Sequence, residues 1–151
     1  MIFYTIYTSQ PRSKITRELL DEVTSVSVEN NKKKNVTGML LGLENKFIQY
    51  LEGDEEEVKS LFETIRKDAR HHDVYQWVSG FAESRVFSEW SMGSWLLSNE
   101  EMSALPALED ISTFLGETGS SHQSSRFLQM MKDLLETWLM HEPERANRMK
   151  Q

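Results

Sequence analysis

The sequence predicts an α+β fold in which two helices cover one face of a mixed β-sheet. Segments with the two-residue period of strands and segments with the 3.6-residue period of helices follow one another in the order β-α-β-β-α-β-β. Short turns separate these segments. The order is typical of a ferredoxin-like sandwich, and the residues after about position 95 add a helical appendage.

Composition limits the class of protein. The chain has 151 residues, enough for one domain with an appendage, and its formal net charge of -7 argues against nucleic-acid binding. The one basic run, Lys32–Lys34, is expected in a solvated loop between a helix and a strand. Cysteine is absent from the sequence, which excludes disulfides and thiolate catalysis. The first residues form neither a signal peptide nor a membrane span, so we expect a cytoplasmic protein without a membrane partner.

The first strand and helix place polar groups beside apolar ones. In the strand Ile2–Ser9, side chains alternate between faces, so Tyr7 and Ser9 share one face. Thr16 is the expected N-cap of the following helix, whose buried stripe is Leu19, Val23 and Val26. Asn30 continues that stripe. An amide is therefore expected at the buried end of the first helix.

A hairpin and a second helix follow. Two apolar strands, "NVTGMLLGL" and "KFIQYLEG", flank a short turn at Glu44 and Asn45. Asp54, with Glu57 three residues later, resembles a capping box that opens an amphipathic helix. Asp68 occupies the next position after its apolar stripe. The inward faces of both helices therefore end in polar residues.

One glutamine stands out within the hairpin. In "FIQYLEG" both faces of the strand are largely apolar, yet Gln49 carries two donors and two acceptor lone pairs. Leaving these groups unpaired in a core would cost roughly 1 to 3 kcal/mol. Gln49 therefore needs partners inside the protein, either a ligand or a backbone group or buried water.

The rest of the chain supplies two more strands and the appendage. The stretch 74–84 reads as a fourth strand, and the stretch 88–97 contains a short fifth strand. Ser98 and Glu101 open a helix, Pro106 restarts it and Gly116 is the expected C-cap. A polar linker, 116–125, precedes a strongly apolar helix around 127–139. We expect these helices to cover the outer face of the sheet or a partner subunit.

Polar side chains from several elements converge on the space between the sheet and its two helices. They share hydrogen-bonding groups that face an otherwise apolar slot, which predicts a polar ligand with a planar or apolar body. The set is Tyr7, Ser9, Asn30, Asn31, Gln49, Asp68, Arg70 and His71.

The first 95 or so residues resemble the BLUF family, blue-light sensors that use flavin. The resemblance rests on five motifs in a specific order and spacing. They are "YTSQ" (7–10), "NNKKKNVTGMLL" (30–41), "FIQYLEG" (47–53), "IRKDARHH" (65–72) and "RVFSEWSMG" (85–93).

The resemblance implies a role for each matching residue. Tyr7 corresponds to the photoactive tyrosine, and Gln49 to the glutamine between that tyrosine and the flavin. Trp90 and Met92 correspond to a fifth-strand pair that exchanges places near the glutamine during signalling. Thr64 departs from family members that have an arginine near the ring. The remaining matches are cofactor-binding positions: Ser9, Asn30, Asn31, Asp68, Arg70 and His71.

The resemblance also implies a function. The chain is expected to be a blue-light photoreceptor with FAD, or alternatively FMN, and not an enzyme. Flavin excitation would drive reversible proton-coupled electron transfer through Tyr7 and Gln49, and a rearrangement of hydrogen bonds would follow. The change would reach the C-terminal helices and a protein partner or homo-oligomer. The expected organisation is a photosensor domain at 1–95, a helical extension at 96–142 and a flexible tail at 143–151.

Other interpretations remain beside this one. The chain could be a flavin oxidoreductase, or a ferredoxin-like interaction module without a chromophore. Asn30 and Asn31 could form a left-handed helix C-terminus, and Asp68 and Arg70 a local ion pair. His71 and His72 are adjacent in sequence and point in different directions, so no metal site is expected there.

Overall fold

The computed structural model describes residues 1–116 and 124–150 and contains the predicted sandwich. The strands are β1 (Ile2–Pro11), β2 (Thr37–Gly42), β3 (Phe47–Gly53), β4 (His71–Ala82) and β5 (Gly93–Leu96). The helices are α1 (Arg17–Lys34), α2 (Glu55–Arg66), α3 (Asn99–Ala104), α4 (Pro106–Gly116), α5 (Ser124–His141) and α6 (Pro143–Met149). The strand order is β4-β1-β3-β2-β5, in which β2 and β5 are parallel and the other neighbours are antiparallel. The ferredoxin-like α+β fold class is confirmed.

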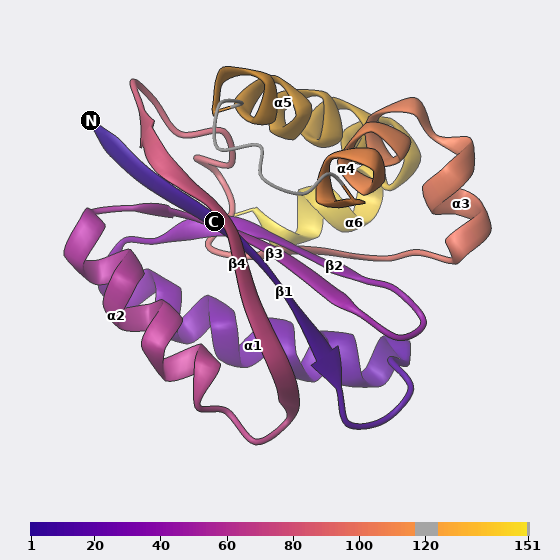
Figure 1. The fold of residues 1–151 in the computed structure, drawn as a ribbon, viewed down its shortest axis with the longest axis horizontal. Helices are drawn as coiled ribbons and strands as arrows, with labels where there is room; N and C mark the ends of the chain where they lie inside the picture. Colours follow the sequence, from indigo (N-terminus) through magenta and orange to yellow (C-terminus); the bar gives the residue numbers. More distant parts are fainter. Residues whose placement is uncertain (117–123, 151) are drawn as a thin grey trace.

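Helices cover both faces of this sheet (Figure 1). The helices α1 and α2 lie on one face, which we call the inner face. The helices α3 to α6 lie on the other, the outer face. None of the helices in the described part of the chain combines the length and apolar character needed to cross a membrane.

The start of α1 agrees with the sequence prediction, and its end does not. The Thr16 hydroxyl accepts a hydrogen bond from the Leu19 backbone N–H at 3.1 Å and so caps the helix. The helix continues through Lys32–Lys34, which form its last turn and are not a loop. Asn35 closes the helix in the left-handed conformation, with φ of 52°. The prediction that Asn30 and Asn31 end the helix is therefore wrong.

The hairpin and α2 also begin where predicted. The Leu43 N–H donates to the Lys46 carbonyl at 2.8 Å across the turn between β2 and β3. The Asp54 carboxylate accepts from the backbone N–H groups of Glu56 and Glu57 and caps α2. However, α2 ends at Arg66, so the prediction that Asp68 continues the inward stripe of this helix is wrong, and Arg70 and His71 also lie beyond the helix. Because β4 begins at His71, earlier than expected, Asp68 and Arg70 belong to the turn before it.

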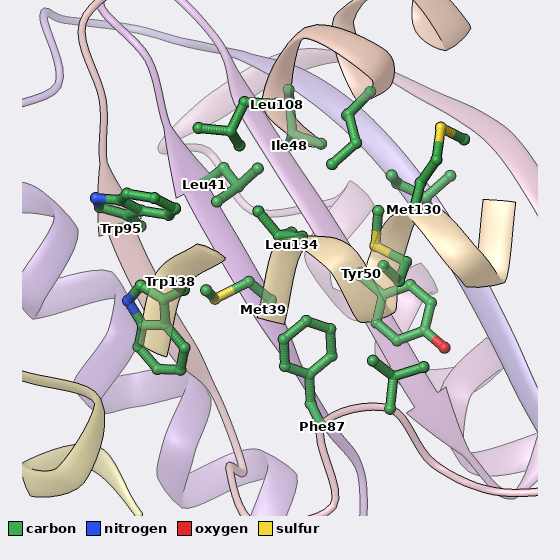
Figure 2. Close-up of a cluster of buried hydrophobic side chains, with 14 of the residues drawn as sticks. Met39, Leu41, Ile48, Tyr50, Phe87, Trp95, Leu108, Met130, Leu134 and Trp138 are labelled. Atoms are coloured by element: carbon green, nitrogen blue, oxygen red, sulfur yellow. The ribbon is translucent and has the colours of Figure 1, made fainter. Parts of the chain in front are cut away.

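The C-terminal helices close the outer face. Ser98 and Glu101 form a reciprocal capping box at α3, and α4 begins at Pro106, as predicted. Most of the predicted linker, 117–123, lies outside the described residues. Figure 2 shows side chains of α4 and α5, including Leu108, Leu134 and Trp138, packed over the outward side chains of β2 and β3. The outer face therefore contains a continuous apolar core.

The last segment differs from the expected flexible tail. Residues Pro143–Met149 form α6, whose Ala146 is fully buried. Arg145 donates to the Ser94 hydroxyl in β5 at 2.9 Å and to the Asp21 carboxylate in α1 at 2.7 Å. These contacts attach α6 to an edge of the sheet and to a helix of the inner face.

Candidate functional site

A pocket lies between the inner face of the sheet and the helices α1 and α2. Its empty volume is about 660 Å³, which includes space open to solvent. Every residue to which the resemblance assigns a photoactive or cofactor-binding role lines it: Tyr7, Ser9, Asn30, Asn31, Gln49, Asp68, Arg70 and His71. The apolar part of the lining includes Val23, Val26, Leu40, Leu61 and Ile65. The structure therefore brings the predicted site residues together from separate elements.

Tyr7 and Gln49 lie at the centre of the sheet. They are direct partners across the antiparallel pair β1–β3, and both side chains are buried. The Tyr7 ring contacts the Phe62 ring edge-on, with centroids 5.1 Å apart. Burial, and then the nearby Asp68 carboxylate, raise the pKa of the Tyr7 phenol well above its usual range. The Tyr7 phenol is therefore protonated at neutral pH.

Gln49 has a partner that the strand pattern alone did not identify. Its Nε2 donates to the Met92 thioether sulfur at 3.5 Å. A thioether is a weak acceptor and offers no donor in return. The contact therefore depends on which end of the Gln49 amide faces Met92.

Asn31 connects the pocket to the segment that carries Met92. Its side-chain Nδ2 donates to the Ser91 carbonyl at 2.6 Å, and the residue is buried on α1. Asn30 also lines the pocket but is exposed. Both side chains therefore reach the pocket from inside α1, which continues to Lys34, and not from the end of the helix.

The turn after α2 forms one rim of the pocket. The Arg70 guanidinium donates to both Asp68 carboxylate oxygens, at distances from 2.6 to 3.1 Å. These hydrogen bonds hold the pKa of Asp68 below its usual value. The predicted local ion pair is present, and both residues also line the pocket. His71 lies beside them, with Nδ1 2.8 Å from the Ser9 hydroxyl oxygen.

Trp90 and Met92 are not the pair of strand residues that we expected. Both precede β5, and they face opposite sides of the sheet. Met92 contacts Gln49 in the inner core, whereas Trp90 belongs to the outer core. The Trp90 indole N–H donates to the Ala146 carbonyl in α6 at 2.9 Å. Of the expected pair, Met92 alone lies beside Gln49 in this structure, because the irregular backbone turns the two side chains apart.

One polar residue of the pocket was missed. Ser27 lines it from α1, four residues after Val23 and three before Asn30. This spacing places the three side chains on one helix face, so the helical period could have identified Ser27. Thr64, which departs from the family pattern, lies in the lining as well.

The pocket suits a planar heterocycle. Val23, Val26, Leu61 and Ile65 provide apolar walls from the two helices, and Val26 remains 42% exposed because it faces the pocket. Amide and charged groups stand at the edges, where hydrogen bonds to ring carbonyl and nitrogen atoms are needed. This chemistry matches that of a flavin ring. Within the described ranges, no group of three or more His, Cys, Asp or Glu side chains could hold a metal ion.

Comparison with known proteins identifies the family to which the chain belongs. The model of one family, described as sensors of blue-light using FAD, matches residues 2–93. Photoactivated adenylate cyclase subunit beta of Euglena gracilis is 31% identical over 116 residues, 76% of this chain and 13% of that protein. The blue light- and temperature-regulated antirepressor BluF of Escherichia coli (strain K12) is 33% identical over 92 residues, 61% of this chain and 23% of that protein. The chain thus spans less than a quarter of these two relatives.

Solved structures are similar over most of the chain. BlsA in its photo-activated state is 26% identical, with a TM-score of 0.70, and the match covers 89% of this chain and 95% of that one. A bacterial light-regulated adenylyl cyclase is 30% identical, with a TM-score of 0.66, and the match covers 85% and 36%. Klebsiella pneumoniae BlrP1 with FMN and cyclic diGMP is 27% identical, with a TM-score of 0.60, and the match covers 93% and 35%. With a family match over most of its length and the predicted residues gathered in one pocket, this chain belongs to the BLUF family of blue-light sensors that use flavin.

Proposed function

We propose that this photoreceptor holds FAD in the inner pocket and signals through a reversible change in the Gln49 hydrogen bonds. The observation that carries the proposal is the contact between Gln49 and Met92, because it joins the pocket to the segment that leads to the C-terminal helices. FAD is proposed because the family is defined by it, and FMN is the alternative. Mass spectrometry of the extracted cofactor distinguishes the two.

The pocket residues have separate roles in holding the cofactor. Asn30 and Asn31 offer amide donors to the ring edge, and Val26 and Ile65 cover its faces. Arg70, at the rim, supplies the positive charge that suits a phosphate group. When bound, the flavin absorbs blue light and in its excited state accepts an electron.

Tyr7 is the proposed source of that electron. Its phenol is buried and protonated, so removing an electron leaves a strongly acidic group in a site that disfavours charge. The phenolic proton must therefore leave together with the electron, and Gln49 lies directly opposite to pass it on. Both particles return to Tyr7 at the end of the cycle. The sequence of events releases no product, which is consistent with a sensor and not an enzyme.

Gln49 is the proposed switch. The two ends of its amide have nearly the same shape and opposite hydrogen-bonding character. With Nε2 toward Met92 the amide donates to the sulfur, but a rotated amide would place its carbonyl oxygen against a group that cannot donate. Rotation therefore exchanges bonds without changing packed volume, and it removes the bond to Met92.

The proposed output runs from Met92 through Trp90, two residues earlier in the same segment, to α6. Trp90 touches the outer layer in two ways, through its hydrogen bond to the Ala146 carbonyl and through its ring, whose centroid is 5.3 Å from that of Trp138 in α5. A displacement of Met92 therefore reaches two C-terminal helices within one short segment. We propose that light changes how these helices pack, and that a protein partner or a second copy of the chain responds.

The absorption spectrum before and after blue light tests the proposed function. The purified protein should show an oxidised flavin spectrum that shifts slightly to the red in light and returns in darkness. Irreversible bleaching would instead favour a flavin oxidoreductase. A colourless protein that does not take up added FAD would favour an interaction module without a chromophore.

Substitutions at the two central residues test their roles. Gln49→Leu and Tyr7→Phe should each retain the flavin and lose the normal red shift, because each removes one hydrogen-bonding group and little volume. Gln76→Leu and Tyr75→Phe are matched controls, since both residues are exposed on β4 and outside the pocket. If both central variants cycled like the parent protein, the assignment of these roles would be wrong.

A further inference from the structure

Glu52 is a buried carboxylate outside the pocket. It lies near the end of β3 with no exposed surface, and its two oxygens accept four hydrogen bonds. Oε2 accepts from the Val86 backbone N–H at 2.8 Å and from the Tyr50 hydroxyl at 3.0 Å. Oε1 accepts from the Phe87 backbone N–H at 2.6 Å and from the Thr37 hydroxyl at 3.0 Å. Four donors use about all the acceptor sites that a carboxylate has.

Glu52 and Gln49 hold the two ends of one segment, 86–92. Glu52 binds the backbone N–H groups at its start, and Gln49 binds the Met92 sulfur at its end. The two residues are three positions apart on β3, which is paired with β1 on one side and β2 on the other. A strand paired on both sides is stiff. The separation between the two ends of the segment is therefore set by β3.

The backbone between these ends is tied as well. The Trp90 N–H donates to the Phe87 carbonyl at 3.1 Å, and the Gly38 N–H donates to the Trp90 carbonyl at 3.1 Å. Asn31 holds the Ser91 carbonyl at 2.6 Å. These bonds hold Trp90 and Ser91 to β2 and α1, and the Trp90–Phe87 bond joins this part of the segment to the residue that Glu52 holds.

We propose that Glu52 is a positioning residue for the photocycle, because its bonds to Val86 and Phe87 fix where Met92 meets the Gln49 amide. The proposal rests on the function proposed above, in which the Gln49–Met92 contact carries the signal. Glu52 acts from the opposite face of the sheet and touches neither Met92 nor the pocket. It is the anchor at the start of the segment.

Two substitutions separate positioning from stability. Glu52→Gln keeps the size of the side chain but leaves one acceptor oxygen, so its NH2 group must face the N–H of Val86 or Phe87. Thr37→Val removes the hydroxyl that donates to Glu52 and accepts from Arg85, and it leaves both N–H bonds in place. Both changes disturb the same buried site, and only the first breaks a bond between Glu52 and a backbone N–H group of the segment. Glu56→Gln, on the exposed surface of α2, is the matched control.

The experiment uses the flavin-bound protein in the dark, labelled with ¹³C at the methionine methyl groups, with Met92 assigned through Met92→Leu. Glu52→Gln should shift the Met92 methyl resonance, and the amides of Val86 and Phe87 should exchange at least about tenfold faster than in the parent protein. The rate of dark recovery after blue light should change, with the size of the red shift retained. Thr37→Val and Glu56→Gln should leave the Met92 resonance in place.

An unchanged Met92 resonance and recovery rate in Glu52→Gln would overturn the proposal, as would an equal change in Thr37→Val. If Glu52→Gln did not fold, amide exchange in the parent protein would decide. The Val86 and Phe87 amides should then be as protected as those of β3, and fast exchange at both would overturn the proposal. The Met92 resonance and the amide exchange require no photochemistry, so a parent protein without a light response would refute the proposed function separately.

Discussion

The two faces of the sheet differ in how completely they are filled. On the inner face, α1 and α2 leave a pocket, and Val26 of α1 remains 42% exposed at its wall. On the outer face, aromatic and aliphatic side chains fill the space, and Trp138 of α5 is fully buried between Trp90 and the start of β5. The same strands supply both faces by alternation. The comparison indicates that the open face can bind a cofactor, and that the filled face can register small displacements because close-packed cores resist deformation.

The largest expected effect is a loss of stability on the filled outer face that the open inner face should not show. Trp138→Ala should lower the free energy of unfolding by about 3 to 5 kcal/mol, because it leaves a large cavity in the outer core. Val26→Ala, at the partly exposed pocket wall, should cost less than about 1 kcal/mol. Denaturant unfolding of the flavin-bound variants measures both values. Similar losses in the two variants would contradict the contrast between the faces.

A smaller effect tests how tightly the outer face is packed. A Cβ atom at Gly93 would lie 2.8 Å from the Trp138 ring and 3.1 Å from the Met39 sulfur. Gly93→Ala should therefore destabilise the protein by about 1 to 3 kcal/mol through overpacking. Gly116→Ala is the matched control, since a Cβ there meets no atom of the described residues within 4 Å, and it should change stability by less than about 0.5 kcal/mol. Equal thermal midpoints for the two variants would show that the outer core can yield.

The sequence predicted the regular elements and the inner pocket better than it predicted the segments that join the two faces. Tyr7 and Gln49 follow the period of strands, so their shared face could be read directly. The segment before β5 has no period, and nothing local showed that Trp90 and Met92 turn apart. The stretch 143–149 is polar in sequence and was therefore expected to be a tail. In the structure it forms a helix, in which Ala146 is the one buried residue. These positions depend on tertiary contacts between distant residues.

Glu52 shows the same limit within a regular strand. A charged residue near the end of an apolar strand usually marks the point where the strand reaches solvent. Here its donors come from Thr37 and Tyr50 and from a segment more than thirty residues later, at Val86 and Phe87. The residue types of those backbone donors carry no signal, because any non-proline residue offers an N–H group.

The smallest expected effect is the pH dependence of stability that comes from Asp68 at the pocket rim. Glu52, in the outer layer, should contribute a pH dependence of the opposite sign. Hydrogen bonds from Arg70 lower the pKa of Asp68, so its contribution to stability is present above the ordinary pKa of 3.8 and is lost as pH falls through the lower folded value. The ion pair is partly exposed, and solvent limits this contribution to about 0.5 kcal/mol. Burial raises the pKa of Glu52. Its contribution to stability is therefore fully present below the ordinary pKa of 4.5 and is lost as pH rises through the folded pKa.

Unfolding free energies measured from pH 3 to 7 separate these opposite signs. The stability difference between the parent protein and Asp68→Asn should increase as pH rises from 3, because the parent then gains its ion pair. The difference between the parent protein and Glu52→Gln should decrease as pH rises above 4.5, because the parent then keeps a buried charge that the variant lacks. If both stability differences changed in the same direction with pH, the pKa values of Asp68 and Glu52 would not be shifted in opposite directions, and the contrast between the rim and the outer layer would be wrong.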